Sequence, residues 1–166
     1  MEIENNYEFT FAGGDYNSYF FATDSKIVYE VKFRDTAYIF NGYLDFNIQA
    51  FEMIIQVESN PTSKNPSLDP KISLTIATIF KDFFQKLPEQ VIIYICDSSD
   101  SRQLARKRKF DRWIDLFKGE DFSRVNSTIV DIEGRIYYNA LIIKRSNPHY
   151  TVITDAFIAL AEEQDK

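Results

Sequence analysis

The sequence has a single cysteine, a single histidine and only five glycines among 166 residues. One cysteine cannot form an intramolecular disulfide, so a disulfide-stapled secreted scaffold is excluded and a reducing compartment fits. Cys96 lies in the apolar run VIIYIC, where burial keeps a thiol protonated and inert, so we expect a small core residue. His149 follows Asn147-Pro148, and we expect an exposed turn histidine there rather than a general base.

Long hydrophobic runs are also missing. No stretch approaches transmembrane length, and the start of the chain, MEIENNYEF, is acidic and has no apolar signal core. We therefore expect a cytoplasmic protein with no membrane partner. Since 166 residues are enough for one well-buried core and few for two, we expect a single domain over residues 1–166.

What the sequence does contain is core-forming material and an uneven distribution of charge. Hydrophobic residues make up 45% and aromatic residues 16%, a composition typical of a folded domain. The net charge is −6, but seven Lys/Arg and four Asp lie between Asp97 and Lys118, which is a local +3. A basic patch on an acidic chain favours a local anion or an acidic partner over a long nucleic-acid footprint.

Apolar and polar residues alternate in three segments of the first third of the chain, 7–11, 27–34 and 51–58. Such alternation is typical of half-buried antiparallel strands. Asp24-Ser25-Lys26 indicates a tight turn that joins YFFAT to IVYEVKF in a hairpin. Residues 35–49 are less regular, since AYIF is compatible with a strand and Gly42 interrupts it.

The rest of the chain alternates between predicted helices and strands. Asp69-Pro70 predicts the cap and first residue of an amphipathic helix that ends before Pro88. The run VIIYIC is apolar without alternation, as expected for a central strand covered on both faces. We then expect a helix over 101–118, a hairpin around Glu133-Gly134 and a short helix over 154–163. This order predicts an α+β domain with one mostly antiparallel sheet: an N-terminal β-meander, a helix, the central strand, a helix, a β-hairpin and a short C-terminal helix.

The stretch YICDSSDSRQLARKRKFDRW, residues 94–113, carries six cations and is the candidate site. At 100° per residue, Phe110, Trp113, Ile114 and Phe117 form one apolar face of the predicted helix. Arg106 falls inside that face, whereas Arg102 lies at its border. The other cations are expected on a solvated outer face without function, together with two aspartates: Lys107, Arg108, Arg112, Asp111 and Asp115.

Two interpretations of the inner arginines remain open. In the structural one, the carboxylates of Asp97 and Asp100 pair with Arg102 and Arg106, because a guanidinium on the buried side needs a partner. In the functional one, the arginines, two serine hydroxyls and the free N–H groups of the helix end hold an anion. We favour the structural interpretation, because two carboxylates in the loop would repel a phosphate. The candidate ligand-binding residues are Asp97, Ser98, Ser99, Asp100, Arg102 and Arg106.

Other kinds of chemistry have little support in this stretch. It has no glycine, so it is not a P-loop. Two aspartates supply too few oxygens for a metal site, and we expect none. No Ser/His/Asp motif surrounds the histidine, so no catalytic residue is assigned.

The same stretch, followed by YYNALIIKRSNPHY (137–150), resembles a family of small bacterial proteins that form a domain of unknown function. In that family a YICD-type strand end leads into an arginine-rich helix with a terminal Phe-x-x-Trp, which here is Phe110 to Trp113. The likeness covers most of the chain. It implies a bacterial origin and brings no established activity.

The predicted order of elements also resembles the core of the GNAT-type N-acetyltransferases. In that fold a loop with an Arg/Gln-x-x-Gly-x-Gly/Ala signature holds the pyrophosphate of coenzyme A. The corresponding segment here, SNPTSKNPSLDPKI, has no glycine, and its prolines remove N–H donors. The GNAT asparagine and general-acid tyrosine also have no match. We therefore expect no cofactor, coenzyme A being the one that this resemblance implies.

These observations lead to three hypotheses about function. The first is a non-catalytic binding module that holds a partner protein or a small anionic ligand near Asp97–Arg106. The alternative is an atypical GNAT-like acyltransferase. The third is association with nucleic acid through the basic helix. The sequence predicts no oligomeric state.

Overall fold

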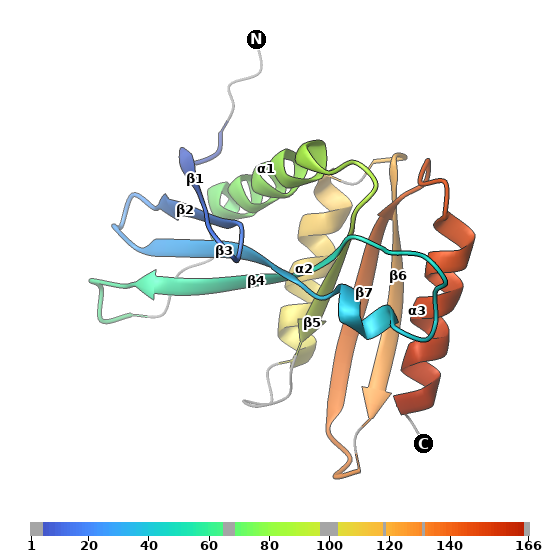
Figure 1. The fold of residues 1–166 in the computed structure, drawn as a ribbon. Coiled ribbons are helices and arrows are strands. Elements are labelled where there is room, and N and C mark those ends of the chain that lie inside the picture. The colour runs from blue at the N-terminus through green and yellow to red at the C-terminus, as the bar shows by residue number, and fades with distance from the viewer. Residues whose placement is uncertain (1–4, 65–68, 97–102, 118, 131, 165–166) are drawn as a thin grey trace. The chain divides into compact units, whose positions relative to one another are not determined.

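A computed structural model describes residues 5–64, 69–96, 103–117, 119–130 and 132–164. These residues form an α+β fold with a seven-stranded sheet in the order β1-β2-β3-β4-β5-β7-β6 and three α-helices (Figure 1). The elements are β1 (Phe9–Gly13), β2 (Ser18–Ala22), β3 (Val28–Asp35), the 3₁₀ helix η1 (Ala37–Phe40), β4 (Ala50–Ser59), α1 (Pro70–Lys86), β5 (Val91–Cys96), α2 (Gln103–Phe117), β6 (Phe122–Val130), β7 (Ile136–Lys144) and α3 (Tyr150–Gln164).

The sheet is mixed and mostly antiparallel, which confirms the predicted fold class. The pairs β1–β2, β2–β3, β5–β7 and β6–β7 are antiparallel, whereas β4 and β5 run parallel with Ala50 opposite Val91. The predicted hairpins around 24–26 and 133–134 are also confirmed, because β2 pairs with β3 and β6 pairs with β7. A GNAT-like fold stays a prediction.

Two segments differ from the expectation. AYIF is compatible with a strand but forms η1, because the Asp35 Oδ1 accepts a hydrogen bond from the Ala37 N–H at 2.9 Å and turns the chain. Helix α3 begins at Tyr150, four residues before the predicted start at 154. There the Asn147 Oδ1 accepts from the His149 N–H at 2.9 Å, and the Asn147 carbonyl accepts from the Tyr150 N–H at 3.1 Å. This turn starts the helix at once.

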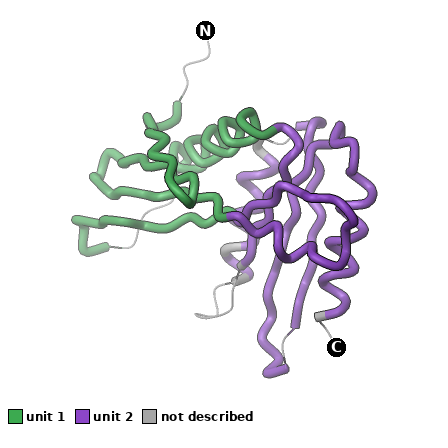
Figure 2. The backbone as a smooth tube through the Cα atoms, viewed as in Figure 1, with its two compact units in different colours: residues 1–34, 53–87 green, residues 35–52, 88–166 purple. Residues whose placement is uncertain are grey.

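The chain separates into two compact units, coloured differently in Figure 2. Unit 1 consists of residues 1–34 and 53–87, and unit 2 of residues 35–52 and 88–166. Strand β4 contributes to both, since the division falls between Glu52 and Met53. The expectation of a single domain over 1–166 stays a prediction, and each unit is described by itself.

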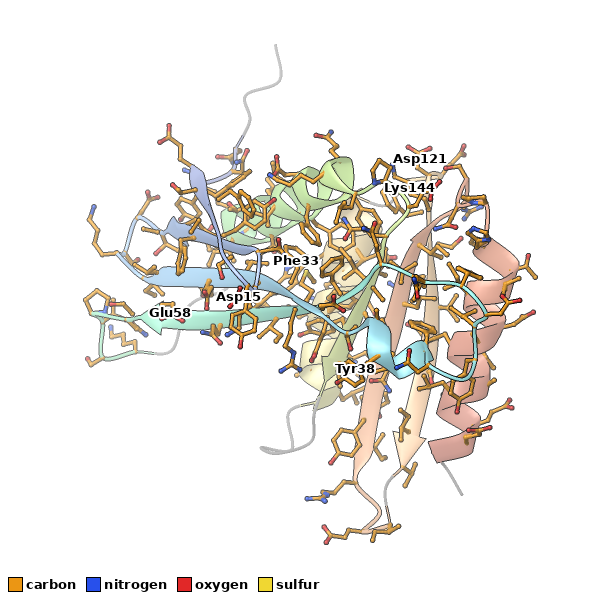
Figure 3. All side chains as sticks on the ribbon, viewed as in Figure 1. Asp15, Phe33, Tyr38, Glu58, Asp121 and Lys144 are labelled. Atoms are coloured by element: carbon orange, nitrogen blue, oxygen red, sulfur yellow. The ribbon has the colours of Figure 1, made fainter. Side chains whose placement is uncertain are left out.

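In unit 1 the apolar face of α1 packs against the strands. The predicted face is buried, with Ile72, Ile76, Ile79, Phe80 and Phe83 each at most 7% exposed. The ring of Phe83 stacks on that of Phe33 in β3 with centroids 4.0 Å apart (Phe33 is labelled in Figure 3). The cap is also as predicted, because the Asp69 carboxylate accepts from the Lys71 N–H at 2.9 Å and Pro70 is the first helical residue.

In unit 2 helical segments cover both faces of strands β5 and β7. On one face Val91, Ile93, Leu141 and Ile143 form a buried cluster with residues of α3 and with Phe40 of η1. On the other face the ring of Tyr94 stacks on Phe110 of α2, with centroids 3.9 Å apart. The predicted central strand with two covered faces is therefore confirmed. No helix among the described residues combines the length and the apolar character needed to cross a membrane.

Candidate functional site

Most of the predicted site lies outside the described residues. Asp97, Ser98, Ser99, Asp100 and Arg102 all fall between the end of β5 at Cys96 and the start of α2 at Gln103. Arg106 belongs to α2 by its backbone, and its side chain lies outside the description, as does that of Cys96. The salt-bridged junction therefore stays a prediction, and the anion site stays its alternative.

The helix that follows this junction is firmly anchored. Phe110, Trp113 and Ile114 are 1%, 7% and 2% exposed, which confirms three members of the predicted apolar face. Phe110 and the β5 residue Tyr94 stack with an angle of 6° between their rings. Because large aromatic side chains hold this face against the strand, the position of the opposite, outward face is set.

The two aspartates of α2 are paired with cations. Lys107 Nζ lies 2.6 Å from an Asp111 carboxylate oxygen, one turn along the helix. From strand β6, Arg124 Nη1 lies 3.0 Å from an Asp115 carboxylate oxygen and 3.5 Å from one of Asp111. The same Nη1 also donates to the Asp111 carbonyl oxygen at 3.2 Å. The side chain of Asp111 is only 19% exposed, so it is drawn inward and does not share the solvated face predicted for it.

Arg124 is the residue that sequence reasoning missed. It lies 9 and 13 residues beyond the two aspartates it contacts. No local spacing rule connects a helix to a strand over such separations. The alternation of β6 assigns Arg124 to one face of the sheet, and only the register between β6 and α2 shows which carboxylates it meets.

Three further cations of α2 are at exposed positions: Arg108, Lys109 and Arg112. We call these residues the α2 cationic surface. All three are exposed, as predicted for Arg108 and Arg112, and Lys109 Nζ lies 5.3 Å from the centre of the Trp113 ring. Arg108 and Arg112 form no ion pair or hydrogen bond within the described part of the chain. Their guanidinium groups are thus available to bind carboxylate or phosphate oxygens in bidentate geometry.

An apolar residue extends this surface. Leu104 precedes Arg108 and Arg112 at intervals of four residues, so the three side chains lie along one stripe of the helix. Leu104 is 44% exposed. The stripe therefore offers both charge and an apolar contact, a combination that suits a protein surface better than a free ion.

In unit 1, Tyr19 and Asp82 have shifted pKa values, and their roles are structural. Burial, followed by the hydrogen bond to Asp82, raises the pKa of Tyr19 far above its ordinary value. Burial also raises the pKa of Asp82, but hydrogen bonds from Tyr19 and Lys86 outweigh it and leave that pKa lowered. The hydroxyl thus stays neutral and the carboxylate stays charged at neutral pH. An acid or base that works near pH 7 needs the opposite shifts.

The histidine is exposed at the start of α3, in agreement with the prediction. Its ring packs against that of Phe46, with centroids 4.3 Å apart. The backbone N–H of His149 donates a hydrogen bond to the Asn147 Oδ1. The Asn147 Nδ2 in turn donates to the Glu89 carbonyl at 3.0 Å. These contacts hold a turn and account for the residue without catalysis.

The chain belongs to a family of unknown function, DUF6169, whose model matches residues 68–159. The match runs from the cap of α1 into α3 and includes the junction of β5 with α2. It confirms the resemblance predicted from the two quoted stretches. No curated protein and no solved structure matches the chain.

Proposed function

We propose that this family member is a cytoplasmic, non-catalytic binding module that holds an anionic group with helix α2. The ligand is an acidic patch on a partner protein. The alternative ligand is a free anion. The observation that carries the proposal is the α2 cationic surface, in which Arg108 and Arg112 are exposed and unpaired among the described residues. The predicted residues Arg102 and Arg106 precede this surface in the sequence.

The arrangement of charges around α2 supports an acidic ligand. Lys107 and Arg124 neutralise Asp111 and Asp115, so the acids of the helix do not offset its outward arginines. The chain as a whole carries a net charge of −6, which would repel an anion elsewhere on the surface. Among the described residues of α2, the exposed Arg108 and Arg112 are therefore the cations that an acidic ligand would meet.

A protein partner is favoured over a free anion by the shape of the surface. The exposed side chains lie along about two turns of a helix, with Leu104 beside Arg108 and Arg112. A free anion requires donors that converge on one point, whereas protein interfaces combine arginine anchors with apolar contacts spread over a larger area.

The test compares two double variants that remove the same charge. R108Q/R112Q alters the α2 cationic surface, and K26Q/K64Q alters two exposed lysines of unit 1. Binding of a fluorescent peptide of glutamate and leucine residues is measured at two salt concentrations. We expect R108Q/R112Q to weaken binding about tenfold, the sum of two exposed charge contacts, and K26Q/K64Q to leave it unchanged.

Other probes separate this proposal from its rivals. Pyrophosphate that protects the wild type against heat but not R108Q/R112Q would identify a free anion as the ligand. Tighter binding of duplex DNA than of the acidic peptide, with a steep salt dependence, would replace the proposal with nucleic-acid association. Tight binding of acetyl-coenzyme A with acetyl transfer would overturn its non-catalytic part. Equal peptide binding by both double variants would show that the α2 cationic surface is not the binding site.

A further inference from the structure

The segment between β3 and β4 is unusually long for a connection inside a compact unit. Fourteen residues lie between Asp35 and Ala50, and only η1 gives them regular structure. Connections between neighbouring elements most often have about two to six residues, and longer ones are commonly functional. A segment of this length therefore calls for an explanation beyond joining two strands.

This segment is fixed on unit 2 rather than loose. Phe40 is 2% exposed and belongs to the buried cluster of β5, β7 and α3, with Phe46 packed at its edge. The Tyr43 hydroxyl donates to a carboxylate oxygen of Glu163 in α3. The ring of Phe46 in turn packs against that of His149. Contacts with α3 and the sheet thus set the shape of the segment independently of any ligand.

The segment forms an open cavity of about 390 Å³ that is lined wholly by residues from 37–48. Such a volume lies within the range of small-ligand sites, about 300–1,000 Å³. Aromatic and aliphatic side chains form part of the lining, namely those of Phe40, Leu44, Phe46 and Ile48. Phe40 belongs to the buried cluster and the other three pack against it, so the cluster supports the apolar part of the cavity.

The polar part of the lining consists of Asn41, Asp45 and Asn47, all of them exposed. Asp45 is the one ionisable side chain in this lining. Within the described part of the chain, none of the three side chains makes a hydrogen bond or an ion pair. By contrast, Asp35 at the start of the same segment accepts from the Ala37 N–H. The three polar groups at the cavity therefore have acceptor oxygens that no contact in the described part of the chain uses.

We propose that this cavity binds a primary ammonium or guanidinium group carried on an aliphatic chain. The aliphatic chain covers the exposed side-chain carbons of Leu44, Phe46 and Ile48, as lysine and arginine stems do on apolar surfaces. The cationic head meets the Asp45 carboxylate and the amide oxygens of Asn41 and Asn47, which form charge-assisted hydrogen bonds with it.

The charge of the lining makes this choice selective. A carboxylate or phosphate would be repelled by Asp45, with no cation in the lining to offset it. A neutral chain would fill the apolar part but leave the carboxylate without a partner. The same chemistry is offered by a free alkylamine and by a lysine or arginine side chain of a partner protein. The site is separate from the α2 cationic surface and does not depend on the proposed function.

The experiment uses four probes of matched length on the full chain: n-pentylammonium, n-butylguanidinium, pentanoate and 1-pentanol. Backbone amide chemical shifts are followed during each titration. We expect the two cations to shift amides within residues 37–48, with a dissociation constant on the order of 1 mM for probes of this size. Pentanoate and pentanol should cause no saturable shift there. Equal binding of pentanol or pentanoate would overturn the proposal.

Two variants with the same change of charge test the role of the carboxylate. D45N should weaken binding of both cations about tenfold, since it replaces a charge-assisted contact with a neutral one. D155N, at an exposed position of α3, should bind them as the wild type does. Both substitutions are at exposed positions, so folding is preserved. If D45N binds like D155N, or if the shifts map elsewhere, the cavity is not the site.

A last comparison assigns the source of the cation. An acetylated and amidated lysine tripeptide is titrated beside n-pentylammonium. Tighter binding of the peptide supports the site with a partner's side chain as ligand, because flanking backbone adds contacts. Tighter binding of the free amine supports it with a small molecule as ligand. If neither probe saturates the wild type, the proposal fails.

Discussion

Helices α1 and α2 both carry charged side chains beside an apolar face, but they use them differently. In unit 1 the Tyr19 hydroxyl donates to Asp82 of α1 at 2.5 Å, and Lys86 pairs with the same carboxylate at 3.0 Å. The Lys86 Nζ also lies 4.0 Å from the centre of the Phe11 ring. In unit 2 the outward arginines of α2 have no such partners among the described residues.

The difference comes from what the neighbouring strands supply. Strand β2 brings a tyrosine to the acid of α1, so the charges of that helix are engaged within unit 1. Strand β6 brings Arg124 to the acids of α2, and this leaves Arg108 and Arg112 in excess. We expect polar groups that pair within the fold, such as Tyr19 and Asp82, to contribute to stability. We expect exposed cations such as Arg108 and Arg112 to contribute to binding. The predictions below test that distinction.

The largest effect is expected from Tyr19→Phe. Tyr19 is fully buried, and the substitution removes its hydrogen bond to a charged carboxylate. We expect the free energy of unfolding to fall by about 1.5 kcal/mol, as measured by urea denaturation. Tyr38→Phe is the matched control, because Tyr38 is 66% exposed, and it should change nothing. Equal effects of the two substitutions would contradict the structural role given to the Tyr19–Asp82 contact.

A second prediction concerns alkaline pH. Burial, followed by the hydrogen bond to Asp69, raises the pKa of Tyr7 from its ordinary 10.0 to about 12. Because the folded pKa is the higher one, the contribution of Tyr7 to stability is complete below pH 10 and is lost as the pH rises towards 12. Denaturation curves from about pH 9 to about pH 11.5 should show a falling free energy of unfolding, less steep for Tyr7→Phe. Identical slopes would contradict the raised pKa.

The third effect is smaller and concerns both stability and binding. Arg124→Gln leaves Asp111 and Asp115 without their strand partner. We expect a loss of about 1 kcal/mol in stability, because Asp111 and Arg124 are both largely buried. Binding of the acidic peptide should also weaken about threefold, because the freed carboxylates offset the α2 cationic surface.

The control for Arg124→Gln is Arg135→Gln. Arg135 pairs with Glu133 at 3.0 Å, and both side chains are more than half exposed. This substitution should change neither the stability nor the peptide affinity. If Arg124→Gln weakens the fold but leaves the affinity intact, the acids of α2 do not control the charge of its outward face.

Much of the architecture could be predicted from local patterns. The cap at Asp69-Pro70, the buried face of α1 and the buried face of α2 at Phe110, Trp113 and Ile114 were all predicted correctly. Cap chemistry acts within four residues, and burial repeats with the helical period, so both are visible in a short window. The strand pattern of β4 is less regular, since Met53 is buried whereas Val57 is 43% exposed.

The candidate site was predicted less completely. Exposure of Arg108 and Arg112 follows from the helical wheel, and the structure agrees. The helical wheel does not predict the role proposed for them, because that role depends on the ion pairs of Arg124 with Asp111 and Asp115. The salt bridges expected between Asp97, Asp100 and the inner arginines fall on residues outside the description and stay predictions.

By itself the sequence determined the α+β class, the order of the strands and α-helices, the buried faces of α1 and α2, and the family. All of these rest on periodicity, turn chemistry and motifs that are local along the chain. Only the tertiary structure decided that Arg124 meets Asp111 and Asp115, and that residues from 37–48 form an open cavity with Asp45 in its lining. Both depend on the register of strands against helices and on packing against α3, and these bring together residues that no local rule connects.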